Sequence, residues 1–372
     1  MSARHLDALR IIAAGAVVAL HYSDYARSQP IGNFLLIHTQ HFNLFVDLFF
    51  VISGYVIASQ YLDSVDSARS VGHFVWRRLA RIYPLHVATL LFYVVLALAI
   101  HFGMVRSDNP DRYPFTDLPA QLVLLHSLWG ERLTFNFPSW SLSAEMFCYL
   151  AFPAIAALCL RRKEFALLLV VLPVAANCLW VLAARSEPWA EWINQGGAFR
   201  ALPAFDLGVA SYLFRDWISR WRIHPFALPA SLIVFLALGS YLSVSVGLLA
   251  VYAIALLAIH FDCAGHSTPL TKLGLHRWSH LTYSCYMLHV PVATVVLTFG
   301  ARHLPSWIPG GRLTLIPIAV LALMAASVLS YRFFETPLRQ HLNRAFGRSG
   351  AGHPAVPPAA PTPALPVQEA TH

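Results

Sequence analysis

The sequence predicts an all-α, polytopic membrane protein with about ten transmembrane helices and both termini in the cytoplasm. Of the 372 residues, 57% are hydrophobic and only 12% are charged, and the mean hydropathy is +0.57, which excludes a soluble domain. The apolar residues form long runs and do not alternate with polar residues, so helices are favoured over a β-barrel. The basic residues gather in every second connection between these runs, as the topology requires.

Ten apolar segments are long enough to cross a bilayer as helices. They cover residues 7–26, 42–62, 84–104, 141–160, 164–184, 198–217, 225–242, 244–261, 279–300 and 313–334. The segment 198–217 is the least secure, because it contains Arg200, Pro203 and Asp206. The first segment lacks a small-residue cleavage site, so we expect an uncleaved anchor. We expect a membrane domain over 1–340 and a disordered, Ala/Pro-rich cytoplasmic tail over 341–372.

Positive charge orients these segments. With the N-terminus inside, 18 of the 26 Lys and Arg residues fall on inner segments, 7 fall on outer segments, and Arg200 lies within a span. The net charge of +8 is therefore a topology signal, and we expect membrane lipids and no nucleic acid as partners. Residues 70–84 form a basic amphipathic segment at the inner surface. Residues 117–129 are too short to span and favour an interfacial or re-entrant helix.

The first span carries a polar stripe. Arg10 and His21 are eleven residues apart, which places them on one helix face, and Asp7 and Asp24 extend the same face. An Arg within a spanning helix costs about 2.5–3.5 kcal/mol on insertion scales, so the stripe should face a hydrated, protein-lined interior. The alternative is that these groups only pack helices together or reach to the membrane surface.

Asp47 lies about one turn inside the outer end of the second span, at a depth similar to that of His21. If the two helices are neighbours, the carboxylate could orient the imidazole, and His21 could act as a general base. The alternative is a polar pair that only locks two helices.

Arg77, Arg78 and Arg81 form a basic cluster at the inner boundary. The guanidinium group donates two hydrogen bonds at once to a phosphate, so a cytoplasmic donor that carries a nucleotide fits this cluster. The alternative is a lipid-headgroup anchor or a topology signal.

Three further groups are candidates. Glu145 lies just inside the fourth span and needs a polar partner or a ligand. Tyr286 and His289 lie on one face of the ninth span, although a lone intramembrane His is often only a packing group. Glu335 lies at the inner end of the last span, where it could pair locally with Arg332 or Arg339.

These residues form two layers. The arginines lie towards the cytoplasm, and His21, Asp47 and Glu145 lie towards the outer half. The arrangement suits a transmembrane reaction between an anionic inner donor and an outer acceptor, but it also suits a transporter or flippase of an anionic solute, or a scaffold without catalysis. The five cysteines show no metal-ligand spacing, and we expect no metal.

Six motifs, in order, resemble a known family. They are LDALR with the following His21, FVDLFFVISGY, RRLARIYP, WSLSAEMFCYLAFP, YSCYMLHVP and FFETPLR, and they extend from about Arg4 to Arg339. The chain resembles the acyltransferase family 3 of membrane acyltransferases.

The resemblance implies ten spans in a bacterial inner membrane and the transfer of an acyl group, often acetyl, from cytoplasmic acyl-CoA to a hydroxyl of a glycan or lipid-linked saccharide. It also implies functional roles for a set of matching residues. His21, Asp47 and Glu145 would be catalytic, Arg10, Arg77, Arg78 and Arg81 would bind the donor, and Tyr286, His289 and Glu335 would line the substrate path. The acyl chain, the acceptor hydroxyl, the oligomeric state and the choice between direct transfer and an acyl-enzyme stay open.

Overall fold

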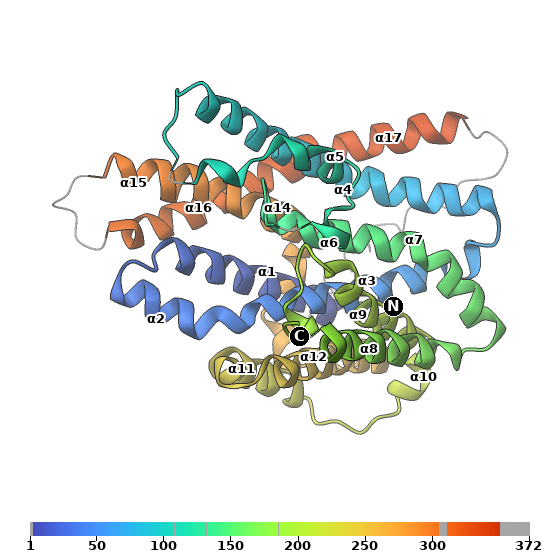
Figure 1. Ribbon diagram of the computed structural model, residues 1–372. Coiled ribbons are helices and arrows are strands. Elements are labelled where there is room, and N and C mark those ends of the chain that lie inside the picture. Colours follow the sequence, from blue (N-terminus) through green and yellow to red (C-terminus); the bar gives the residue numbers. More distant parts are fainter. Residues whose placement is uncertain (1–2, 108, 131, 185, 305–310, 350–372) are drawn as a thin grey trace, which may run out of the picture.

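The computed structural model describes residues 3–349, apart from residues 108, 131, 185 and 305–310. Within these residues the extended regular structure is helical (Figure 1). The α-helices are α1 (Arg4–Tyr25), α2 (Pro30–Thr39), α3 (Phe45–Tyr61), α4 (Ala68–His101), α5 (Leu118–Leu122), α6 (His126–Trp129), α7 (Trp140–Arg161), α8 (Phe165–Ala184), α9 (Gly197–Leu213), α10 (Arg215–Ile218), α11 (Ala227–Leu238), α12 (Val244–Ala264), α13 (Pro269–Lys272), α14 (Thr282–Ala293), α15 (Gly300–Arg302), α16 (Ile316–Leu329) and α17 (Thr336–Ser349).

Each of the ten predicted spans contains a helix, which confirms the all-α membrane class. Among the described residues, eight helical stretches are long and apolar enough to cross a membrane. The predicted spans 198–217 and 225–242 correspond to the shorter helices α9 and α11. The total of ten crossings and the cytoplasmic position of the termini stay predictions.

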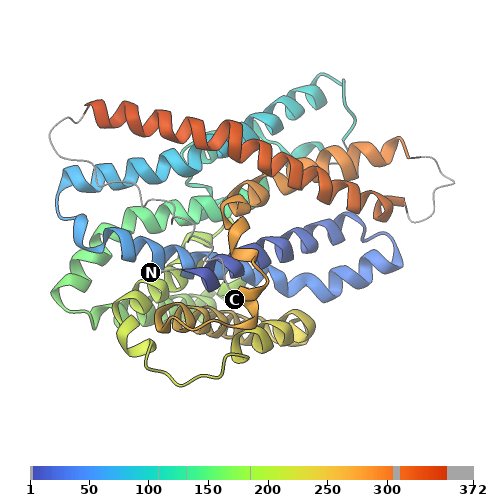
Figure 2. The ribbon, with the colours of Figure 1, turned by 180° about the vertical axis from the view of Figure 1, so that it is seen from behind.

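The inner end of α4 differs from our expectation of a separate surface segment before Pro84. α4 is one helix of 34 residues, about 51 Å long, which exceeds a hydrocarbon core of about 30 Å. α17 runs beside the first part of α4 (Figure 2). Trp76 stacks on Phe346 at 4.9 Å between ring centroids and donates a hydrogen bond to the Leu342 carbonyl. The expected tail is therefore helical from 341 to Ser349, and residues 350–372 lie outside the described residues.

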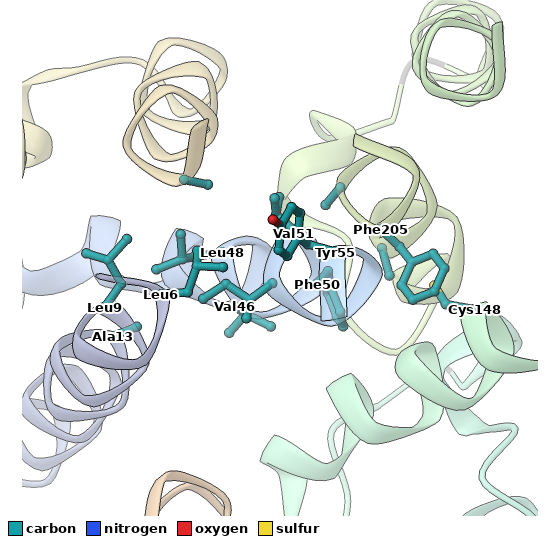
Figure 3. Close-up of a cluster of buried hydrophobic side chains, with 14 of the residues drawn as sticks. Leu6, Leu9, Ala13, Val46, Leu48, Phe50, Val51, Tyr55, Cys148 and Phe205 are labelled. Carbon is teal, nitrogen blue, oxygen red and sulfur yellow. The ribbon is translucent and has the colours of Figure 1, made fainter. Parts of the chain in front are cut away.

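The central contact of the fold joins α3 to α9. A Cβ on Gly54 would overlap the Phe205 carbonyl, and a Cβ on Gly208 would overlap the Val51 carbonyl, so glycine lets the two backbones touch at both points. Around this crossing, side chains of α1, α3, α7 and α9 form a buried apolar cluster (Figure 3). α1 therefore packs against α3 at the centre of the bundle.

The segment predicted as interfacial or re-entrant forms the short helices α5 and α6. They are separated at Leu124, which has a positive φ of 55°. Gln121, His126 and Ser127 are buried although they are polar. The segment therefore folds into the protein and contacts the start of α7, where the Ser127 hydroxyl donates to the Ser143 hydroxyl at 2.8 Å.

Candidate functional site

A cavity opens between α1, α3, α4, α7 and α14, and it contains about 910 Å³ of empty space, its open mouth included. Three of the four predicted arginines line it together with Glu145 and Tyr286. The polar residues of its wall include Arg10, Arg78, Arg81, Ser53, Ser141, Glu145, Tyr149, Tyr283 and Tyr286. Arg77 is exposed on the surface of α4 and does not line the cavity.

The buried arginine of this wall is Arg78. Its guanidinium donates to the Tyr61 hydroxyl at 2.9 Å and to the Gln60 side-chain oxygen at 3.4 Å, and it lies 4.9 Å from the Tyr61 ring centre. It is buried, and its Nε finds no hydrogen-bond partner among the described residues. Arg10 is held by Asp7 at 3.3 Å. The cavity therefore offers guanidinium donors that an anionic ligand could complete.

Glu145 occupies the middle of the cavity wall. Its Oε1 accepts hydrogen bonds from the Ser53 hydroxyl at 2.7 Å and the Tyr149 hydroxyl at 2.6 Å. Tyr149 follows Glu145 by one helical turn, so α7 itself supplies one donor and α3 supplies the other. The structure thus provides the polar partners that a carboxylate in a membrane requires.

Tyr286 lies on the cavity wall and is also in contact with residues outside the cavity. Its hydroxyl lies 2.8 Å from the Ser141 Oγ and donates to the Pro138 carbonyl at 3.1 Å. Its ring packs at 6.0 Å against Phe49. On the other side of Tyr286, the His289 ring lies 5.8 Å away. Tyr286 therefore separates the cavity from the next layer of side chains.

That next layer is a pair of histidines. The His21 and His289 rings stack at 5.1 Å with an angle of 25°. The His289 Nδ1 lies 2.5 Å from the Tyr286 carbonyl oxygen, which can only accept, so Nδ1 carries the proton. Its Nε2 is buried and has no hydrogen-bond partner among the described residues. Phe137 holds the His21 ring from the other side, edge to face at 5.0 Å.

The expectation that Asp47 orients His21 is wrong. Asp47 is fully buried and pairs with Arg200 of α9, whose Nη2 lies 2.6 Å from the Asp47 Oδ2 and whose Nε lies 3.3 Å from both carboxylate oxygens. A buried guanidinium needs a carboxylate more than a neutral imidazole does, and α3 turns Asp47 towards α9. The ring of His21 is instead held between Phe137 and His289.

Glu335 lies apart from the cavity. Its Oε1 accepts from the Ser284 hydroxyl at 2.5 Å and from the Ser330 hydroxyl at 2.7 Å. It ends a π-helical turn, Ser330–Glu335, that joins α16 to α17. These serines take the place of the local arginine pairing that the sequence left open, and they tie α14 to the last helix.

The sequence interpretation missed several polar residues that complete the site. Ser53, Ser141 and Tyr149 all lie on the cavity wall. The spacing of four between Glu145 and Tyr149 is a detectable signal, whereas Ser53 and Ser141 come from other helices and have none. In the described part of the chain, no group of three or more His, Cys, Asp or Glu residues is placed to hold a metal ion.

A family model described as "Acyltransferase domain" matches residues 4–332. This range includes α1, the cavity and the histidine pair, as well as most of the last span.

Individual relatives match different shares of the chain. "Acyltransferase MdmB" of Streptomyces mycarofaciens is 37% identical over 40% of this chain and 38% of its own length. "Peptidoglycan O-acetyltransferase OatA" of Listeria monocytogenes is 24% identical over 90% of this chain and 56% of its own length. "Nodulation protein 10" of Rhizobium leguminosarum bv. viciae is 24% identical over 90% of this chain and 92% of its own length. The matches thus span well under two thirds of MdmB and of OatA. No solved structure matches significantly.

Proposed function

The chain belongs to the acyltransferase family whose model spans residues 4–332, and on that premise we propose that this integral membrane acyltransferase moves an acyl group from cytoplasmic acyl-CoA to a hydroxyl of a glycan. The acyl group that we propose is acetyl. The acceptor is a saccharide of the cell envelope, free or linked to lipid. The name of OatA supports both choices, because it states O-acetylation of peptidoglycan.

The arginines of the cavity hold the phosphates of the donor in this proposal. Arg10, Arg78 and Arg81 line the cavity, and the buried Arg78 has no partner for its Nε among the described residues. A phosphate oxygen there would gain charge-assisted hydrogen bonds. The pantetheine arm then extends past Glu145 towards Tyr286. Arg77 is exposed and does not line this cavity, so we leave it out of the donor site.

The acyl transfer takes place beyond Tyr286. His21 removes the proton of the acceptor hydroxyl while the oxygen of that hydroxyl attacks the thioester carbon. A C–O bond forms and the C–S bond breaks, and the proton passes from His21 to the leaving thiolate of CoA. Phe137 and His289 fix the plane of the His21 ring, so the stacking performs the orienting role that we first gave to Asp47.

One observation carries this proposal: a residue on the wall of the arginine-lined cavity contacts the histidine pair. Tyr286 lies on the cavity wall, 5.8 Å from His289, and His289 stacks on His21. His21 does not itself line the cavity, so the thioester reaches it only when the Tyr286 ring moves. Because Tyr286 is the residue that contacts both the cavity and the histidine pair, this movement is a rearrangement of one side chain.

The test uses purified protein, radiolabelled acetyl-CoA and a panel of glycans. We expect labelled product and release of CoA with the wild type, and less than about one hundredth of both with His21→Ala, in line with a typical contribution of a positioned base. His73→Ala, on the cytoplasmic part of α4, is the matched control. Failure of the wild type to release CoA or to label any glycan would overturn the proposal, and it is the result expected of a transporter.

A further inference from the structure

His21 contacts a segment of the chain that has no role in the reaction proposed above. The edge of the His21 ring contacts Phe137, and the Arg112 guanidinium carbon lies 5.2 Å from the centre of the Phe137 ring. Arg112 lies in the connection between α4 and α5 that we expect on the outer surface. One aromatic ring therefore separates a cationic side chain from the proposed base.

The backbone around Arg112 is firmly held. Its carbonyl oxygen accepts a hydrogen bond from the Phe135 backbone N–H at 3.4 Å. Phe135 is fully buried and has a φ of +50°, which is unusual for a bulky residue and is kept only where the surroundings enforce it. Tyr113 stacks on Tyr93 at 5.6 Å. The loop thus presents Arg112 at a fixed place.

His21 is the more accessible member of the histidine pair. His289 is fully buried, whereas His21, Phe137 and Arg112 are each half-buried. None of these three residues lines the donor cavity. His21 is therefore partly accessible outside the donor cavity, and Phe137 and Arg112 are its half-buried neighbours there.

We propose that Arg112 binds an anionic group of the acceptor, a carboxylate or a phosphate, while the adjoining sugar ring packs on Phe137 with its hydroxyl at His21. This inference rests on the proposed function and names the acceptor class: acidic glycans or phosphate-linked saccharides. The guanidinium fork matches both anions in a bidentate manner, and its position over an aromatic ring leaves its edge N–H groups available to a ligand. Phe137 links the two groups, since its ring contacts both His21 and the Arg112 guanidinium.

The first experiment measures equilibrium binding, so it does not depend on catalysis. Methyl glucuronide and a hexose phosphate are titrated against the full-length protein, with methyl glucoside as the neutral probe. All proteins carry Arg78→Gln, because this change weakens anion binding in the donor cavity. We expect Arg112→Gln to weaken binding of the charged probes about ten- to hundredfold, the value of a charge-assisted hydrogen bond, and Arg112→Lys to weaken it less. Arg132→Gln, an exposed arginine of the same outer segment, is the matched control.

The two charged probes distinguish the two sources of the anion: stronger binding of one assigns the acceptor to acidic sugars or to phosphate-linked saccharides. Equal binding of charged and neutral probes, or an equal effect of Arg112→Gln and Arg132→Gln, would overturn the inference. A second readout is the preference for charged over neutral acceptors in acyl transfer, which Arg112→Gln should lower by the same factor. Failure of the proposed function looks different, because it abolishes CoA release while leaving the binding data unchanged.

Discussion

Replacement of Asp47 tests whether this buried carboxylate stabilises the fold or takes part in the chemistry. Asp47 and Arg200 are both almost fully buried, and three nitrogen–oxygen distances of 2.6 to 3.3 Å join them. Asp47→Asn leaves the Arg200 charge buried without its carboxylate, and removal of one partner of such a pair costs about 3–5 kcal/mol. Replacing both partners by apolar residues of similar size removes the uncompensated charge, so Asp47→Leu combined with Arg200→Met should recover much of the loss.

The assay is denaturant unfolding in detergent micelles, combined with acyl transfer expressed per folded molecule. We expect Asp47→Asn to lower the free energy of unfolding while the folded fraction keeps its activity, because Asp47 contacts Arg200 and not His21. The double variant should be more stable than either single variant. A variant Asp47→Asn that keeps full stability but loses activity would refute this reasoning and return Asp47 to the catalytic group.

Three further predictions concern other parts of the site. Tyr286→Ala should open the cavity to the histidine pair and raise CoA release in the absence of acceptor severalfold, whereas Tyr286→Phe should not. Equal CoA release by the two variants would contradict the idea that the Tyr286 ring separates the cavity from the histidines. Arg78→Gln should raise the KM for acetyl-CoA about ten- to hundredfold with little change in kcat, while Arg77→Gln should leave it nearly unchanged. Burial lowers the pKa of His126 in the folded protein to about 3, whereas His126 in the unfolded chain has a pKa of about 6.5. The unfolded chain therefore takes up a proton at His126 at a higher pH than the folded protein does, so the free energy of unfolding should fall as the pH drops from about 6.5 towards 4. His126→Gln should show a smaller fall in a pH series of unfolding curves, and an identical fall would contradict the assignment.

The sequence carried enough information for the class of the fold. Length and hydropathy of a span are local properties, so each of the ten predicted segments could be found from the chain alone. The continuity of α4 could not be found in this way. A proline normally marks a helix boundary, but α4 continues through Pro84. α17 packs along the part of α4 that precedes Pro84.

The candidate site was predictable where one helix holds the whole signal. Helical spacing predicts that Arg10 and His21 share a face, and that Arg77 and Arg81 share a face. The cavity brings Arg10, Arg78 and Arg81 together, whereas His21 and Arg77 do not line it. Partners across helices were not predictable. Asp47 had two possible basic neighbours, His21 and Arg200, and only the crossing of α3 with α9 decides between them.

The stacking of His21 on His289 shows the same limit. The two residues are 268 positions apart in the sequence, on the first and the ninth predicted spans. Neither residue forms a local pattern that identifies the other. The Tyr22 hydroxyl donates to the His289 carbonyl at 3.2 Å and thereby fixes α1 against α14, which is a tertiary contact.

The most direct test of the account is sidedness. Purified protein is inserted into liposomes in one orientation, with labelled acetyl-CoA supplied on the side of the arginine cavity and the acceptor glycan on the side of Arg112. Since a thioester in the cavity must meet His21 within the membrane, we expect label to appear on the acceptor across the bilayer, and we expect His21→Ala to abolish it. Transfer that occurs only when both substrates are on the same side, or that persists in His21→Ala, would contradict the account.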